Sequence, residues 1–168
     1  MLLLAQADAG QRKVAHEPIN VSALLESVLE GAEIMAAESG LRFQVELPAQ
    51  VRIEGDRALL QTALLNLLTN AVQYNEPGGR VQVELAMQGE AARLEVGNTG
   101  PGIPAEEQVK IFDRFHRGDA ARGRGVDGVG LGLSLAREIV RAHGGELGLQ
   151  ESRAGWTCFA VRLPCGRS

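Results

Sequence analysis

Apolar pairs that recur one helical turn apart constrain the fold of this chain more than any other feature of its sequence. The pairs are Leu59-Leu60, Ala63-Leu64, Leu67-Leu68 and Ala71-Val72. Their spacing predicts a long helix that is apolar enough to lie in a core. Asp56 is a good N-cap for this helix, and the segment Glu76-Pro77-Gly78-Gly79 ends it.

The remaining segments predict further helices and several strands. Asn20 caps a predicted helix over 21–39 that ends at Gly40, and another over 131–143 ends at Gly144-Gly145. A short helix is predicted near 105–112, and strands over 42–47, 80–87, 92–97, 146–151 and 156–163. Helices bunched with antiparallel hairpins indicate an α/β two-layer sandwich, in which three helices cover one face of a mixed, mostly antiparallel sheet.

The composition is that of one ordinary globular domain and excludes several classes of function. The 168 residues are 45% hydrophobic and carry a net charge of -4, which gives no electrostatic footprint for nucleic acid or an anionic membrane. Cys158 and Cys165 are the only cysteines, so neither a disulfide framework nor a zinc site is indicated, and a reducing compartment is expected. The apolar start at 1–5 is too short to cross a membrane, so any such segment is expected elsewhere in the protein.

Three side chains on the long apolar helix indicate a binding site. Asn66, Asn70 and Tyr74 follow one another at intervals of one helical turn and therefore share a face. A buried amide without a partner costs about 1–3 kcal/mol, so two stacked amides on a packed helix need a reason. Carboxamide oxygens are suitable ligands for Mg²⁺, which takes further oxygens from nucleotide phosphates. The alternative is that both amides face solvent or bond to the helix backbone.

Two glycine-containing loops can come close to a ligand. Residues 97–103 follow a predicted strand, and residues 128–133 open a helix whose free N–H groups favour phosphate. Residues 123–128 match the pattern GxGxxG, but no strand precedes them, so a dinucleotide-binding motif is rejected. Between the loops, Phe112 and Phe115 are typical of a local packing pair, whereas Arg114 and Arg117 either hold phosphate oxygens or stay solvated.

Four segments, taken in order, resemble the N, G1, F and G2 boxes of sensor histidine kinases. They are 66–71 (Asn-Leu-Leu-Thr-Asn-Ala), 98–103 (Asn-Thr-Gly-Pro-Gly-Ile), 112–115 (Phe-Asp-Arg-Phe) and 128–133 (Gly-Val-Gly-Leu-Gly-Leu). The resemblance covers about residues 17–164. It implies the Bergerat ATP-binding fold, which DNA gyrase shares, with ATP between the N-box helix and a lid at about 116–129.

The resemblance also implies roles for single residues. Asn70 would hold Mg²⁺, Asn66 would lie beside the phosphates, and Tyr74 would pack on the adenine. Gly100 and Gly102 would form the adenine side of the site, and Arg117 would face the transferred phosphate, so Asn66 and Arg117 are the expected catalytic residues. The other expected ATP-binding residues are Gln73, Asn98, Ile103, Phe112, Phe115, Gly128, Gly130, Leu131, Gly132 and Leu133.

Two positions depart from the family pattern, and a third separates subclasses of the fold. Asn98 replaces the usual Asp that accepts from the adenine amino group; its amide oxygen can still accept, and weaker binding is expected. Gln73 stands where many relatives carry Lys or Arg near the phosphates. Hydrolysing members carry Glu where this chain has Asn66, and without that carboxylate water is poorly activated. A kinase is therefore favoured over an ATPase.

The resemblance implies a protein-histidine kinase that uses ATP and Mg²⁺, similar to the heavy-metal-sensor branch. Its acceptor would be a His on a dimerisation domain absent from this chain, with relay to an Asp of a response regulator. We expect residues 1–14 to be the end of that domain and a linker, and 15–168 to be the catalytic domain. This domain is expected to be monomeric alone and to be the cytoplasmic part of an inner-membrane homodimer. The alternatives are a serine kinase of the anti-sigma-factor type, a nucleotide-binding module without turnover, and a purely structural domain.

Overall fold

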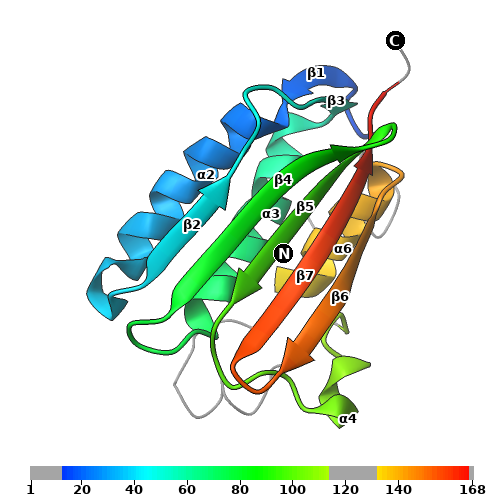
Figure 1. Ribbon diagram of the computed structural model, residues 1–168. Helices are drawn as coiled ribbons and strands as arrows, with labels where there is room; N and C mark the ends of the chain where they lie inside the picture. Colours follow the sequence, from blue (N-terminus) through cyan, green and yellow to red (C-terminus); the bar gives the residue numbers. More distant parts are fainter. Residues whose placement is uncertain (1–12, 114–131, 167–168) are drawn as a thin grey trace.

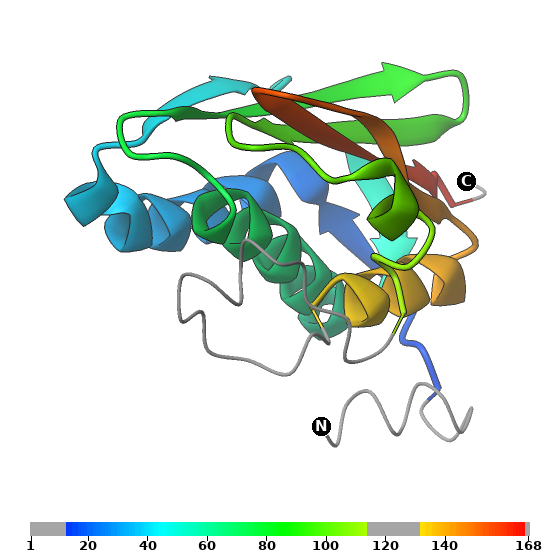
Figure 2. The same ribbon diagram turned by 90° about the horizontal axis from the view of Figure 1, so that it is seen from below.

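The chain folds into two layers, a sheet and a row of helices on one of its faces (Figures 1 and 2). The structure is a computed structural model and describes residues 13–113 and 132–166. Its main sheet has five strands in the order β2-β4-β5-β7-β6. The strands are β2 (Arg42–Glu46), β4 (Arg80–Gln88), β5 (Ala91–Asn98), β6 (Glu146–Arg153) and β7 (Trp156–Pro164). Only the β2–β4 pair of this sheet is parallel, so the predicted mixed, mostly antiparallel sheet is confirmed.

Three helices form the second layer, as the sequence predicts. They are α2 (Val21–Ala36), α3 (Arg57–Gln73) and α6 (Gly132–Ala142), and α3 packs against both of the others. A short 3-10 turn, η1 (Ala37–Ser39), extends α2 up to Gly40, whose φ of 65° ends it as predicted. The short helix α4 (Ala105–Gln108) stands apart, near one end of the sheet (Figure 1). No helix within the described ranges has the length and apolar content needed to cross a membrane.

A second, two-stranded sheet was not predicted from the sequence. It pairs β1 (Glu17–Asn20) with β3 (Arg52–Gly55) in antiparallel register. Ile19 lies opposite Ile53, and both side chains are buried. Each strand has only four residues, which is too short for a period of two to be read, and Pro18 weakens the strand signal further.

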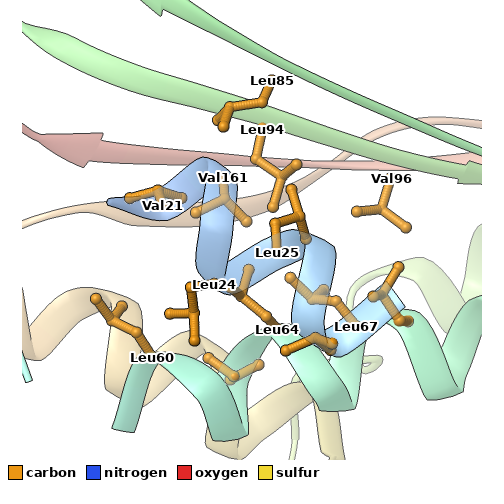
Figure 3. Close-up of a cluster of buried hydrophobic side chains, with 14 of the residues drawn as sticks. Val21, Leu24, Leu25, Leu60, Leu64, Leu67, Leu85, Leu94, Val96 and Val161 are labelled. Atoms are coloured by element: carbon orange, nitrogen blue, oxygen red, sulfur yellow. The ribbon is translucent and has the colours of Figure 1, made fainter. Parts of the chain in front are cut away.

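The core lies between the helices and the inner face of the main sheet. Leucines from α2 and α3 meet Leu85, Leu94, Val96 and Val161 of the sheet (Figure 3). Along β4 and β5 the buried residues alternate with more exposed ones, as expected for a sheet with one face on the core. The apolar stripe of α3 is thus buried on one side, and the neighbouring side, which carries Asn66 and Asn70, is half-buried.

Asp56 joins three parts of the chain at the start of α3. Its Oδ1 accepts from the Leu59 N–H at 3.1 Å, which is the predicted N-cap, and its Oδ2 accepts from the Ala15 N–H at 3.2 Å. The Asp56 N–H donates to His143 Nε2 at 2.9 Å. Because Nε2 accepts, the neutral imidazole carries its proton on Nδ1, which lies 2.8 Å from the Ile139 carbonyl oxygen. The segment before β1 and the start of α3 therefore meet at the buried carboxylate of Asp56, and the end of α6 meets the backbone N–H of the same residue.

Replacement of Asp56 tests this junction. Asp56→Ala removes the cap and should lower the free energy of unfolding by about 1–2 kcal/mol, as typical caps do. Asp56→Asn keeps an oxygen for the Leu59 N–H and should lose less. Thr62→Ala is the control on the same helix, because the Thr62 hydroxyl is exposed and only donates to the Ala58 carbonyl. Denaturant unfolding measures all three, and an Asp56→Ala curve equal to that of Thr62→Ala would contradict the capping role.

Candidate functional site

A pocket of about 400 Å³ opens beside the second half of α3. Its walls come from α3, the loop after β5, α4 and the β6–β7 hairpin, with one residue from α6. The lining residues are Asn70, Tyr74, Asn98, Pro101, Gly102, Ile103, Pro104, Glu107, Ile111, Leu133, Arg153, Ala154, Thr157 and Phe159. A mostly apolar pocket of this size with a few converging polar groups is typical of a small-molecule site.

The pocket brings together six of the residues predicted from the sequence: Asn70, Tyr74, Asn98, Gly102, Ile103 and Leu133. Asn66 lies one turn before Asn70 on α3 and is half-buried outside the pocket lining. Gln73 is exposed, and Gly132 is the first residue of α6. The predicted residues Phe115, Arg117, Gly128, Gly130 and Leu131 lie outside the described residues, as does the predicted lid at 116–129.

Phe112 supports the pocket wall without lining it. Its ring meets that of Phe159 edge to face, with centroids 6.0 Å apart, and the Arg137 guanidinium lies 4.8 Å from the Phe112 centroid. Phe159 does line the pocket. The sequence predicted that Phe112 packs against Phe115. It did not predict the contact of Phe112 with Phe159, which is 47 positions away on β7.

Asn98 is buried at the inner face of β5, with 3% of its surface exposed. Its Nδ2 donates to the Thr99 carbonyl at 2.9 Å. The Nδ2 group keeps a second N–H, and the amide oxygen, which can act only as an acceptor, is the other atom that Asn98 can offer to a ligand. This is the role that the usual Asp would have at this position.

Two glycines allow the loop after β5 to pack closely against the end of α3 and against the β6–β7 hairpin. Gly100 has a φ of 145°, and an added Cβ would collide with the Tyr74 carbonyl oxygen. Gly102 has a φ of 81°, and an added Cβ would lie 2.5 Å from the Arg153 carbonyl oxygen. The Gly155 N–H donates to the Gly100 carbonyl at 3.0 Å, which connects the loop to the β6–β7 hairpin. Both positions therefore need glycine for conformation and for space.

Asn75, which the sequence reasoning missed, connects the segments around the pocket. It is buried, with 4% of its surface exposed. Its Nδ2 donates to the carbonyls of Ala71 and Arg80, and its Oδ1 accepts from the Glu76 N–H and the Thr99 hydroxyl. All four hydrogen-bonding positions of the amide are used. The end of α3 is thereby joined to the start of β4 and to the loop after β5.

The β6–β7 hairpin supplies pocket residues that were also missed, namely Arg153, Ala154, Thr157 and Phe159. Thr157 lies directly across from Asn98 in the β5–β7 register. A signal for it exists in the sequence, because Thr157 is the one polar member of the inward-facing series that continues with Phe159, Val161 and Leu163. The partner strand, however, cannot be read from local pattern.

A second groove of about 270 Å³ lies on the opposite face of the sheet. The Arg80 guanidinium lies 4.8 Å from the Trp156 ring centroid there, and Cys158 lines the groove. Burial, followed by the carboxylates of Glu95 and Glu151, raises the pKa of the Cys158 thiol to about 11. The thiol is therefore protonated at neutral pH and is a poor nucleophile. Within the described part of the chain, no group of three or more His, Cys, Asp or Glu residues could hold a metal ion.

The sandwich, with a pocket between its central helix and the end of the sheet, defines a ligand-binding α/β domain. A family model described as "Histidine kinase-, DNA gyrase B-, and HSP90-like ATPase" matches residues 55–167, and the chain belongs to this family. The sequence is similar to sensor protein IrlS of Burkholderia pseudomallei, with 36% identity over 98% of this chain and 35% of the relative. It is also 32% identical to the signal transduction histidine-protein kinase BaeS of Escherichia coli, over the same shares of the two chains. The chain thus spans about a third of the length of these relatives.

Solved structures agree with the sequence relatives. The mycobacterial sensor histidine kinase MprB aligns with a TM-score of 0.79 and 32% identity, over 88% of this chain and 97% of that one. Full-length ShkA, solved in complex with AMPPNP, aligns with a TM-score of 0.82 and 27% identity, over 99% of this chain and 35% of that one. The predicted fold class and the family resemblance are confirmed.

Gly102→Ala tests the geometry of the pocket loop, and Gly89→Ala is its matched control. Gly89, in the β4–β5 turn, also has a positive φ of 64°, but an added Cβ there meets nothing within 4 Å. Both changes should lower the free energy of unfolding, by about 1 kcal/mol for Gly89→Ala and by more for Gly102→Ala. Only Gly102→Ala should also weaken binding of an ATP analogue, measured by calorimetric titration. Equal effects of the two changes on binding would contradict the close approach at Gly102.

Proposed function

We propose that this chain is the ATP-binding catalytic domain of a two-component sensor histidine kinase. The observation that carries the proposal is the pocket in which α3 and the end of β5 bring Asn70, Tyr74 and Asn98 together. Membership of the kinase and gyrase family supports ATP as the ligand. The full-length enzyme would transfer the γ-phosphate to a His on its dimerisation domain and then to an Asp of a response regulator.

The pocket residues divide into a base-binding part and a phosphate-binding part. The Asn98 amide oxygen accepts a hydrogen bond from the adenine amino group, and the buried position of this amide excludes water that would compete for it. Tyr74, Ile103 and Phe159 supply apolar surface for the base. Asn70 and the more distant Asn66 lie along the same helix toward the phosphates, where Arg117 and the glycines at 128, 130 and 132 are expected to act.

Asn70 fits a magnesium ion that arrives with the nucleotide. Its carboxamide is half-buried and lines the pocket, and an amide oxygen is a ligand that Mg²⁺ accepts. One such ligand suits an ion that takes its other oxygens from phosphates and water, whereas a permanently bound ion would need more protein ligands. When bound, Mg²⁺ would neutralise phosphate charge; Asn70 would position it.

Transfer of the γ-phosphate to a protein nucleophile, and not to water, follows from the side chain at position 66, which is an amide and not a carboxylate. Without a general base one turn before Asn70, water is poorly activated, so the γ-phosphate persists until a protein nucleophile reaches it. An imidazole nitrogen of the acceptor His then forms a bond to the γ-phosphorus while the bond from that phosphorus to the β–γ bridging oxygen breaks, and ADP leaves. Catalysis is mostly positioning and charge stabilisation by pocket residues.

The proposal extends to the protein that carries this domain. Residues 1–14 would be the end of the dimerisation domain and a linker, and 15–168 the catalytic domain. The whole protein would be a homodimer in the inner membrane with this domain on the cytoplasmic side. The names of IrlS and BaeS as a sensor protein and a signal transduction histidine-protein kinase support this arrangement.

Asn70→Ala tests the nucleotide site. In calorimetric titration with a non-hydrolysable ATP analogue, the wild-type domain should bind in the micromolar to sub-millimolar range and should need Mg²⁺. Asn70→Ala should bind at least about tenfold more weakly, which corresponds to about 1.4 kcal/mol. Gln61→Ala is the control, because Gln61 lies on the same helix and is exposed away from the pocket lining.

A transfer assay separates a kinase from a nucleotide-binding module. The domain is joined to a dimerisation domain that carries the acceptor His, and labelled phosphate on that His is followed over time. Acid-labile label that depends on the His and on Asn70 is expected. Binding of ATP without any transfer would support the module instead, and absence of ATP binding by the folded wild type would overturn the proposed site.

A further inference from the structure

Glu107 is the acidic residue among the described side chains that line the pocket. It lies on α4 and is half-buried. Its backbone N–H donates to the Pro104 carbonyl at 2.9 Å, and within the described residues no side chain caps α4. The carboxylate of Glu107 is therefore not needed for the first turn of its own helix, and its place in the pocket wall calls for another role.

Hydrogen bonds hold α4 against the loop after β5. The Gln108 Nε2 donates to the Ile103 carbonyl at 2.8 Å, and the Ile103 N–H donates to Ser152 Oγ of β6, also at 2.8 Å. Ile103 and Pro104 line the pocket together with Glu107. The backbone that carries Glu107 is thus fixed relative to the pocket through a loop that is itself joined to the sheet.

The charge of Glu107 limits which part of a nucleotide can lie beside it. An ionised carboxylate only accepts hydrogen bonds, and it repels phosphate. In the proposed site the phosphates lie toward Asn70 and the start of α6, where Leu133 lines the pocket. The donors that remain on an adenine nucleotide are the amino group of the base and the two hydroxyls of the ribose.

Burial separates these two kinds of donor. Asn98, the proposed partner of the adenine amino group, has 3% of its surface exposed, so the base enters the deep part of the pocket. Glu107 is half-buried and therefore lies nearer to solvent, as a sugar that joins the buried base to the phosphates would. A carboxylate has two oxygens and can accept from both hydroxyls of one ribose. Acidic side chains bind ribose hydroxyls in the same way in the unrelated dinucleotide-binding fold.

We propose that Glu107 determines the sugar specificity of this pocket by accepting hydrogen bonds from the ribose hydroxyls of the nucleotide. The proposal rests on the proposed ATP site. A hydrogen bond to an ionised acceptor is stronger than one between neutral groups. A nucleotide without these hydroxyls leaves the carboxylate unpaired against a mostly apolar pocket, and sites with such an unpaired group reject the wrong ligand strongly.

Three substitutions on α4 separate the pocket carboxylate from its surroundings. Glu107→Ala removes both acceptor oxygens. Glu107→Gln keeps one acceptor oxygen on a side chain of the same length and is the conservative rescue. Glu106→Ala is the matched control, because Glu106 is the neighbouring carboxylate on the same helix but is exposed and outside the pocket lining.

The experiment is calorimetric titration of the domain and these variants with a non-hydrolysable ATP analogue and with its 2′,3′-dideoxy form, in the presence of Mg²⁺. The wild type and Glu106→Ala should bind the dideoxy form about tenfold more weakly than its parent, because the bonds to an ionised acceptor are lost. Glu107→Ala should bind the two forms equally, and Glu107→Gln should keep part of the difference. An effect of the dideoxy sugar on its own conformation is common to all variants and cancels in this comparison.

The failure of this proposal differs from that of the proposed function. If the wild type binds both forms equally, or if folded Glu107→Ala keeps the wild-type difference, Glu107 does not bind the ribose and the proposed ATP site stands. If Glu106→Ala abolishes the difference as fully as Glu107→Ala, the pocket carboxylate is not the determinant and the proposal is likewise overturned. If the wild type, folded by circular dichroism, does not bind the ATP analogue, the proposed function fails and this proposal fails with it.

Discussion

Helix α3 is fixed at both ends by a buried polar side chain, and the pocket depends on the position of this helix. Asp56 caps the first turn, and Asn75 uses all its hydrogen-bonding positions just after the last turn. Between them the apolar stripe packs on α2, α6 and the sheet. One face of α3 therefore packs in the core, and the neighbouring face lines the pocket. The backbone at Asn70 cannot shift without disturbing the core packing.

The sequence predicted the parts of this arrangement that depend on neighbouring residues. Helical period, the Asn20 and Asp56 caps and the glycine that ends α2 are local signals, and all appear in the structure. The family motifs likewise led to Asn70, Tyr74 and Asn98, which the pocket brings together. What could not be predicted depends on distant partners: Ser152 accepts from a backbone group 49 positions away, and Asn75 accepts from Thr99, 24 positions away. A local pattern carries no information on such pairs.

The two faces of the sheet differ in what they allow chemically. The inner face at the pocket combines apolar surface with Asn98 and Thr157, whose side chains are hydrogen-bonded to the Thr99 carbonyl and to the Ser152 hydroxyl. The outer groove combines Arg80, Trp156 and carboxylates, and its one thiol is kept protonated by burial and negative charge. Polar side chains in a mostly apolar pocket favour ligand recognition, whereas the outer face carries charged side chains, among them the ion pair of Arg93 and Glu95, which contributes little because it is partly exposed.

The carboxylate that caps α3 also contacts the segment that precedes β1. Asp56 Oδ2 accepts from the Ala15 N–H, while its backbone N–H donates to His143 at the end of α6. A segment that pulled Ala15 away would leave one buried carboxylate oxygen with one partner fewer, at the end of the helix that carries Asn66 and Asn70. Because an under-satisfied buried carboxylate is costly, the start of α3 and the path of the incoming chain are energetically coupled. The same contact that stabilises the fold therefore also sets how the preceding segment reaches the nucleotide-binding helix.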